Sequence, residues 1–311
     1  MHDPVFCLMG PTASGKTALA FELVKHFPME VISVDSAMIY REMNIGTAKP
    51  DSDELKHVPH HLLDIIEPTD SYSAAHFCDD ATRLIKDIHQ RGKIPLLVGG
   101  TMMYFNALQN GLNQLPEANQ QVRQHIEEEA QEQGWSRLHE KLKDIDPVTA
   151  ARIHNNDTQR IQRALEVYYL TGTPLSVFLA EVKSVSTVNF INLALFPQDR
   201  SWLHQRIAQR FTQMLQTGFM EEVIHLQKKW ILNMEMPSMR CVGYRQALEY
   251  LQGEYDYSTL IEKGIAATRQ LAKRQLTWLR HWKNIDYFDP LKPGYSVDFV
   301  AKIREILDNP L

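Results

Sequence analysis

The chain has 311 residues, of which 44% are hydrophobic and 23% are charged, and its formal net charge is −5. This hydrophobic content is enough for a substantial core and excludes an intrinsically disordered chain. The acidic balance excludes a protein coated evenly with positive charge for nonspecific binding to nucleic acid.

The cysteines lie far apart in the sequence and form neither a CxxC pair nor a disulfide framework; they are Cys7, Cys78 and Cys241. The apolar run near the start is too short for a secretory signal. No segment approaches the roughly 18 apolar residues that a membrane span needs. We therefore expect a cytoplasmic protein that makes no contact with a membrane.

Short apolar runs alternate with helix-like patterns over the first hundred residues. The runs at 5–9, 31–34 and 94–98 predict buried strands, because each is mainly apolar and is followed by a helical pattern. Strands that alternate with helices predict a parallel sheet covered by helices on both faces. The Gly-rich turns fall at strand ends, where such folds bind ligands.

The segment 115–185 has no strand-like run and predicts an all-helical insertion domain. Helices are expected to start at Asp146, which precedes a proline, and at Asp157. The predicted domains are therefore a catalytic core made of 1–114 and 186–311, and the helical insertion between them.

Beyond the insertion, a strand candidate at 189–196 returns the chain to the sheet, and a helix is predicted over 201–216. A long final helix is predicted from 259 to about 283. Between Lys263 and Lys283 the sequence has six Lys or Arg and no acid, although the protein as a whole is acidic. We expect this basic helix to face a negatively charged partner.

A phosphate-binding loop is predicted at 10–17, where GPTASGKT matches the pattern GxxxxGK[ST] directly after a strand and before a helix. Backbone N–H groups, the helix N-terminus and Lys16 supply positive charge to phosphates, and the Thr17 hydroxyl is placed to hold Mg²⁺. A nucleotide hydrolase usually adds a strand that ends in Asp, whereas here the candidate strand ends in 99–101, Gly-Gly-Thr. This departure leaves room for a ligand other than ATP, one that carries a diphosphate.

Eight ordered blocks run through essentially the whole chain: GPTASGKT at 10–17, VDSAMIY at 34–40, IGTAKP at 45–50, HHLLD at 60–64, LVGGT at 97–101, QRIQRALE at 159–166, RCVGYR at 240–245 and ATRQLAKRQ at 267–275. Together they closely resemble the bacterial members of the tRNA dimethylallyltransferase family, the isopentenyl-diphosphate:tRNA transferases. So many blocks in order are far more specific than the phosphate loop alone.

The resemblance implies an α/β fold with a parallel sheet like that of the P-loop NTPases, turned from nucleotide chemistry to prenyl transfer. It implies a transferase that moves the dimethylallyl group of dimethylallyl diphosphate to N6 of adenosine at tRNA position 37, in tRNAs reading codons that begin with U, and releases diphosphate. The implied partners are the tRNA anticodon stem-loop, dimethylallyl diphosphate and Mg²⁺. We expect a monomer, because one chain would handle one tRNA-sized substrate.

The exocyclic amine of adenine is a poor nucleophile, so the enzyme must orient it, accept its proton and stabilise the leaving diphosphate. By the resemblance, Asp35 hydrogen-bonds the amine and acts as general base, and Thr101 contacts the substrate near the transferring group. Considered as a residue alone, Asp35 is equally well explained as a helix cap, and Thr101 could be a helix cap as well as a substrate contact. The resemblance assigns the diphosphate to Gly10, Pro11, Thr12, Ala13, Ser14, Gly15, Lys16, Thr17 and Arg210, and the metal to Thr17.

RNA contacts are assigned by the same resemblance to six parts of the sequence. We expect the target base to be unstacked from its loop, and the two substrates to enter one channel from opposite ends. The predicted tRNA-binding residues are Asp35, Ser36, Ala37, Met38, Thr101, Arg123, Gln159, Arg160, Ile161, Gln162, Arg163, Arg240, Cys241, Val242, Gly243, Tyr244, Arg245, Lys273, Arg274, Gln275, Leu276, Thr277, Trp278, Leu279 and Arg280.

Alternatives to this interpretation remain open from the residues alone. The phosphate loop also suits a small-molecule kinase that uses ATP. A prenyltransferase acting on free adenine nucleotides would share the loop and Asp35 but would not need the basic helix. A noncatalytic RNA-binding protein would keep the basic helix and would not depend on Asp35. The pair His60 and His61 lacks a third ligand for zinc, and we expect it to be structural.

Overall fold

The computed structural model of the chain describes residues 3–113, 115–180 and 186–309. The chain forms two compact units, one made of Met1–Gln109 and Ser186–Leu311 and the other of Asn110–Val185. The domain boundaries expected from the sequence, 114 and 185, lie outside the described residues.

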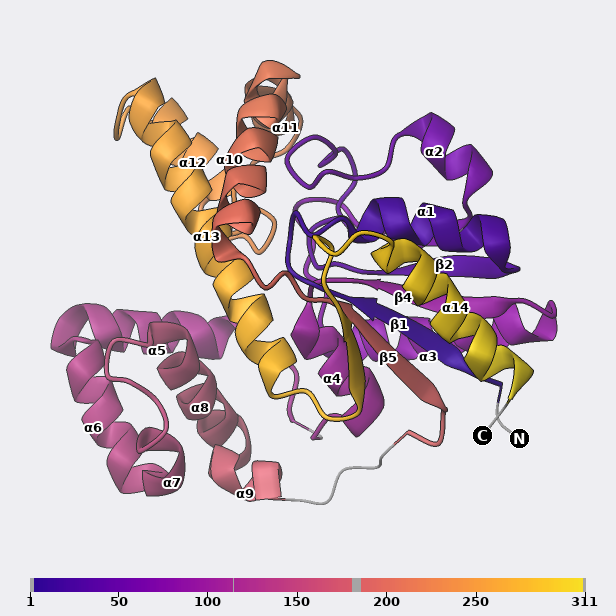
Figure 1. The fold of residues 1–311 in the computed structure, drawn as a ribbon. Coiled ribbons are helices and arrows are strands. Elements are labelled where there is room, and N and C mark those ends of the chain that lie inside the picture. The colour runs from indigo at the N-terminus through magenta and orange to yellow at the C-terminus, as the bar shows by residue number, and fades with distance from the viewer. Residues whose placement is uncertain (1–2, 114, 181–185, 310–311) are drawn as a thin grey trace. The chain divides into compact units, whose positions relative to one another are not determined.

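The larger unit is built on a sheet whose six described strands run in the order β3-β2-β4-β1-β5-β6, with every neighbouring pair parallel (Figure 1). The predicted parallel α/β fold is therefore confirmed. The strands are β1 (Val5–Met9), β2 (Met29–Val34), β3 (His60–His61), β4 (Ile94–Gly99), β5 (Phe190–Leu195) and β6 (Ile285–Phe288).

Helices cover the sheet on both faces, so its central strands are apolar throughout. Alternate residues of β1 belong to two different core clusters, as strand geometry requires. One cluster includes α3 (Ala74–Gln90) and α4 (Met102–Asn110), and the other includes α1 (Lys16–His26) and α14 (Tyr295–Asp308) (Figure 1). The short α2 (Ser52–His57) lies between β2 and β3 in the chain.

A third core cluster lies among four helices of the larger unit and the turns that follow β2. Phe211, Phe219 and Tyr244 form its buried aromatic centre. Close packing depends on Gly264, since a Cβ there would come within 2.0 Å of the Phe211 ring. The helices are α10 (Arg200–Gln216), α11 (Phe219–Lys229), α12 (Tyr244–Leu251) and α13 (Tyr257–Arg280).

The sequence pattern predicts that the basic helix α13 is the last element of the chain, and this prediction is wrong. Both β6 and α14 follow it. Strand β6 has only two half-buried residues and so gives no continuous apolar signal, while α14 closes the sheet face through Phe299 and Ile303. No helix within the described residues is long and apolar enough to cross a membrane.

The described part of the smaller unit is all-helical, as predicted. Its core is formed by Ile126, Leu138, Leu142 and Leu165 with their neighbours. The expected helix start at Asp157 is confirmed, since its side chain accepts the N–H of Arg160. The helices are α5 (Gln120–Gln133), α6 (Trp135–Ile145), α7 (Pro147–Ala150), α8 (Thr158–Thr171) and α9 (Leu175–Ala180).

Candidate functional site

Three loops meet at the carboxyl edge of the sheet, where parallel α/β folds bind their ligands. They follow β1, β2 and β4, which are neighbours, and Gly99 at the end of β4 is in register with both Met9 and Val34. A Cβ at Gly99 would lie 2.0 Å from the Val34 carbonyl oxygen, so only glycine lets these strand ends come together. The phosphate loop, Asp35 and Thr101 are therefore brought to one place.

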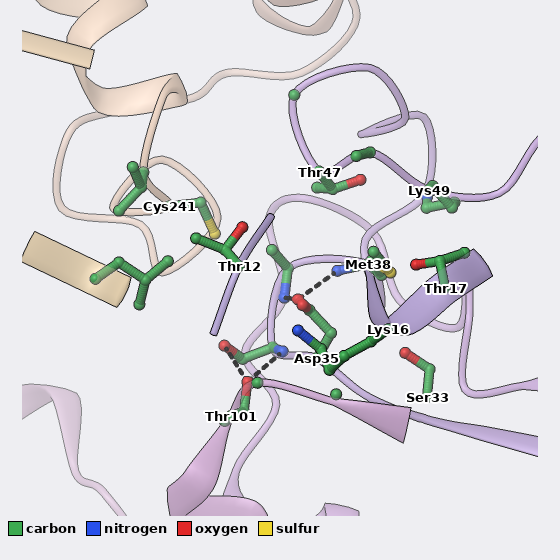
Figure 2. A pocket seen from close by; sticks show the side chains of 18 of the residues that line it. Thr12, Lys16, Thr17, Ser33, Asp35, Met38, Thr47, Lys49, Thr101 and Cys241 are labelled. Atoms are coloured by element: carbon green, nitrogen blue, oxygen red, sulfur yellow. Dashed lines mark hydrogen bonds between the residues drawn. The ribbon is translucent and has the colours of Figure 1, made fainter. Parts of the chain in front are cut away.

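A pocket of about 760 Å³ opens at this edge, and all its lining residues belong to the larger unit (Figure 2). Its carboxylates are Asp35 and Glu54. Cations outnumber them, which suits an anionic ligand in an otherwise acidic protein. The lining cations are Lys16, Lys49, Arg210, Arg240 and Arg274.

The phosphate loop has the geometry of an anion cradle. Ala13 and Gly15 have positive φ values of 63° and 100°, so the backbone curls before α1 begins. No side chain of the described residues caps the N-terminus of α1, which leaves its N–H groups and dipole available to an anion. The carbonyl of Ala13 accepts a 2.9 Å hydrogen bond from Nε of Arg206 on α10, which holds the curled loop in place.

Lys16 is half-buried in this cradle, and its Nζ donates to the carbonyl oxygens of Gly10 and Pro11 at 2.9 and 2.7 Å. The pKa of Lys16 is lowered to about 7, chiefly by burial and also by the charge of Arg210, while Asp35 acts in the opposite direction. A bound diphosphate adds negative charge, so it must raise this pKa again.

We therefore expect the affinity for dimethylallyl diphosphate, measured calorimetrically without RNA, to fall as the pH rises above about 7. The donor ionises near pH 6 and keeps a constant charge above that. Binding takes up a proton between the free and the bound pKa of Lys16, so affinity falls by up to about tenfold per pH unit there. The variant Lys16→Met should bind dimethylallyl diphosphate weakly, with an affinity that does not fall with pH in this way. A wild-type affinity that stays constant from pH 7 to 9 would contradict the lowered pKa.

Asp35 directly follows β2 and lies beside Lys16 and Thr101 (Figure 2). Its Oδ1 accepts the N–H groups of Ala37 at 2.8 Å and Met38 at 3.3 Å, so it caps a turn and no helix follows. Its Oδ2 has no hydrogen-bond partner among the described residues. One oxygen thus fixes the carboxylate, and the other is available to a substrate.

Thr101 precedes α4, but its hydroxyl does not cap that helix. Thr101 Oγ1 accepts the backbone N–H of Ser36 at 3.1 Å, which joins the loop after β4 to the loop after β2. The hydroxyl thereby lies next to Asp35 at the pocket wall. The Thr101 hydroxyl therefore joins two loops of the site and does not serve as a helix cap.

Burial keeps the other acidic groups near Asp35 protonated at neutral pH. It raises the pKa of Tyr104 and of the Cys241 thiol to about 12 each, and it raises the pKa of Tyr40 and Tyr72 beyond that. A neutral phenol or thiol is a poor proton acceptor. Asp35 is therefore the pocket group best placed to act as a base near the phosphate loop.

Lys49 is a pocket residue that the sequence pattern did not single out. Its side chain is only 3% exposed, and its Nζ donates to the Tyr40 carbonyl at 2.8 Å, to Asn44 Oδ1 at 3.0 Å and to Asp64 Oδ1 at 2.6 Å. It holds together the irregular segment that follows Asp35. A lysine in a turn gives no periodic signal, so only the fold reveals this role.

The predicted RNA-binding residues of the larger unit fall into three groups. Pocket-lining residues are Ser36, Ala37, Met38, Arg240, Cys241, Val242, Gly243, Tyr244, Arg274, Gln275 and Trp278. Arg245, Lys273, Thr277 and Arg280 are exposed outside the pocket lining, and Arg245 pairs with Glu249. The expectation of RNA contact is corrected for Leu276 and Leu279, whose side chains are buried in the core.

In the smaller unit two of the predicted RNA residues, Arg123 and Arg163, contact Glu166, a fully buried carboxylate. Glu166 accepts hydrogen bonds from Arg123 at 2.9 and 3.2 Å and from Arg163 at 2.7 Å. Burial alone would raise the pKa of Glu166, but the two arginines hold it below its usual value. Both are therefore engaged within the unit.

The remaining predicted residues of this unit lie on α8. Gln159 and Arg160 are exposed, and Gln162 donates to Glu127 at 2.8 Å. Ile161 is fully buried in the helical core, because it lies on the inner face of α8. Its predicted side-chain contact with RNA is corrected accordingly.

A family model described as IPP transferase matches residues 38–282, from the turn after Asp35 to the end of the basic helix. The chain belongs to the IPP transferase family. It is therefore a transferase, and the family and fold class expected from the motifs are confirmed.

Relatives in this family match over nearly their full length. The tRNA dimethylallyltransferase of Legionella pneumophila (strain Paris) is 66% identical over 99% of both chains, and that of Cupriavidus necator is 54% identical over 99% of this chain and 96% of its own. The full-length tRNA isopentenylpyrophosphate transferase of Bacillus halodurans has a TM-score of 0.73 at 36% identity, covering 99% and 97% of the two chains. A eukaryotic dimethylallyltransferase acting on tRNA has a TM-score of 0.79 at 29% identity, and the match covers 98% of this chain and 78% of its own.

Proposed function

We propose that this IPP transferase moves the dimethylallyl group of dimethylallyl diphosphate to N6 of adenosine 37 in tRNAs that read codons beginning with U. The observation that carries the proposal is the placement of Asp35 and Thr101 beside a phosphate loop in one cationic pocket. Relatives as similar as 66% are named for this activity. The loop suits the leaving diphosphate, and the free oxygen of Asp35 suits the amine.

In the reaction, the N6 nitrogen forms a bond to the allylic carbon as the bond from that carbon to the diphosphate oxygen breaks. The amine proton passes to Oδ2 of Asp35, whose Oδ1 stays bound to the turn at Ala37 and Met38. Lys16 and Arg210 stabilise the charge that develops on the diphosphate. The raised pKa values of nearby Tyr104 and Cys241 keep those groups from competing for the proton.

We propose Mg²⁺ as the cofactor, held by Thr17 together with the diphosphate. No group of three His, Cys, Asp or Glu able to hold a metal occurs among the described residues, so a site made of protein ligands alone does not fit. Magnesium usually keeps several waters and takes phosphate oxygens as ligands, and the Thr17 hydroxyl at the pocket wall fits that mode. When bound, the ion would neutralise charge on the leaving diphosphate.

We propose that the tRNA docks on the exposed cations of α13, with the target base splayed into the pocket. Lys273, Arg274 and Arg280 are exposed along α13, and Trp278 is 44% exposed where it lines the pocket. Sequence-specific RNA recognition usually uses bases splayed out of loops. The smaller unit, 110–185, would add contacts through Gln159 and Arg160.

The affinity for an anticodon stem-loop is expected to fall by on the order of tenfold or more between 50 and 200 mM salt, because phosphate contacts release counterions. Filter binding over a salt series checks this. Replacing Lys273 and Arg280 together by Gln should flatten the slope. Lys292→Gln, which removes an exposed lysine outside α13, is the matched control and should leave it unchanged. A flat wild-type response would count against α13 as the docking surface.

The test of the function is incubation of the protein and Mg²⁺ with dimethylallyl diphosphate and an unmodified anticodon stem-loop, followed by RNA mass measurement. A gain of one dimethylallyl group, lost when the target adenosine is replaced, supports donor, acceptor and reaction together. Transfer to free AMP with equal efficiency would instead favour a nucleotide prenyltransferase. ATP-dependent phosphorylation of a metabolite, with no gain on RNA, would favour a kinase.

We further propose that the enzyme works in the cytoplasm as a monomer. Its cysteines Cys7, Cys78 and Cys241 are all free thiols, as a reducing compartment maintains. Sedimentation of the protein with and without one equivalent of tRNA tests the stoichiometry.

A further inference from the structure

Gln275 is a buried residue in the C-terminal part of α13, and both polar atoms of its side-chain amide form hydrogen bonds within the protein. Its Oε1 accepts the backbone N–H of Thr12 at 2.8 Å, and its Nε2 donates to the Gly100 carbonyl at 2.9 Å. The two partners fix the orientation of the amide, since one is a donor and the other an acceptor. The side chain is therefore engaged inside the pocket wall and is not directed at RNA.

The two loops held by Gln275 serve different substrates. Thr12 belongs to the phosphate loop, on the donor side. Gly100 is followed by Thr101, whose hydroxyl accepts the N–H of Ser36 next to Asp35, on the acceptor side. The amide therefore stands between the donor loop and the base that would deprotonate the acceptor.

The space around this amide is tight. A Cβ at Gly100 would come within 2.2 Å of Nε2 of Gln275, so glycine is required for the approach. Neighbouring residues on the same helix, Lys273, Arg274 and Trp278, are exposed. One rigid helix thus carries the exposed cations on one side and a fixed tie to both site loops on the other.

We propose that Gln275 is a positioning residue that couples tRNA docking on α13 to the geometry of the donor loop. The inference rests on the proposed function. RNA that immobilises α13 also immobilises Thr12 and Gly100 through the amide, so diphosphate binds to a loop that is already ordered. By linkage, diphosphate must strengthen RNA binding by the same factor.

The test measures the dissociation constant of inorganic diphosphate with Mg²⁺, with and without a saturating unmodified anticodon stem-loop. No donor is present, so no turnover occurs. For the wild type, the stem-loop should tighten diphosphate binding by about fivefold or more. In Gln275→Met, which keeps the volume but loses both hydrogen bonds, the factor should fall close to one, while stem-loop affinity alone changes by less than about threefold.

Two further variants separate coupling from general damage. Gln275→Glu can still accept from Thr12 but repels the Gly100 carbonyl, and it should lose most of the coupling even if the Met variant does not fold. Arg206→Ala removes the other tie to the phosphate loop, from α10 to Ala13, and should weaken diphosphate binding while keeping the coupling factor. A merely structural Gln275 would behave as Arg206 does.

Two outcomes overturn the proposal: a wild-type factor near one, or an unchanged factor in both Gln275 variants. The prenylation assay on the same preparations keeps this result apart from the proposed function. Prenylation by the wild type without coupling rejects only the role of Gln275. Tight stem-loop binding without prenylation rejects the proposed function itself.

Discussion

Asp35→Asn is expected to lower the turnover number by about 10²- to 10⁴-fold, the usual contribution of a positioned general base. The amide oxygen can still accept the N–H groups of Ala37 and Met38, so the turn after β2 should survive. The amide that replaces Oδ2 cannot take the proton from the adenine amine. Single-turnover kinetics with saturating stem-loop and donor measure the loss directly.

The stem-loop affinity of Asp35→Asn should stay within about threefold of the wild type, because the docking cations of α13 are untouched. Asp35→Ala is the comparison variant, since it also removes the cap on Ala37 and Met38. A similar loss of turnover in both variants, with RNA binding kept, isolates the base. Parallel loss of turnover and RNA affinity in the Asn variant would make Asp35 an organiser of the segment that follows it.

Lys16→Met is expected to weaken donor binding by about 10- to 100-fold, since a hydrogen bond to a charged group contributes about 1.5–3 kcal/mol and each 1.4 kcal/mol is tenfold. Turnover should fall further, because negative charge on the diphosphate grows as the bond to carbon breaks. Calorimetry with dimethylallyl diphosphate and initial rates measure the two effects. Lys16 also donates to Gly10 and Pro11, so the melting temperature of the variant is checked first.

Lys25→Met provides the matched control, since Lys25 lies on the same helix α1 but is exposed and, among the described residues, forms an ion pair with Glu22 alone. It should leave donor binding and turnover unchanged. Equal, small effects of the two substitutions would contradict the assignment of the diphosphate to the phosphate loop. A loss confined to Lys16 supports it.

Local patterns in the sequence were enough to predict most strands of the sheet and the phosphate loop. Largely apolar runs identified four sheet strands, because strands that are buried on both faces are predominantly apolar. The phosphate loop could be recognised because a tight curl between strand and helix requires particular residues at fixed spacing. Strand β3, with two residues, and β6, with exposed positions at its centre, lacked such a signal.

The partners of polar side chains could not be predicted from local patterns in the sequence. Arg163 lies three residues before Glu166 on α8, a spacing that the sequence shows, but only the packing of α5 against α8 brings Arg123 to the same buried carboxylate. Lys49 likewise forms an ion pair with Asp64 within an irregular segment whose sequence has no hydrophobic periodicity. A burial pattern predicts which face of an element is covered, but not which charge lies opposite.

By itself, the sequence determined the family, the parallel α/β class and the phosphate loop, since each depends on short-range pattern or on residue type. The choice of Asp35 as base came from the family resemblance and stays a prediction. Only the tertiary structure decided that Gln275 joins Thr12 to Gly100 and that Leu276 and Leu279 belong to the core. The physical reason is that hydrogen bonds and burial depend on contacts between residues hundreds of positions apart, which register and packing fix only when the whole chain has folded.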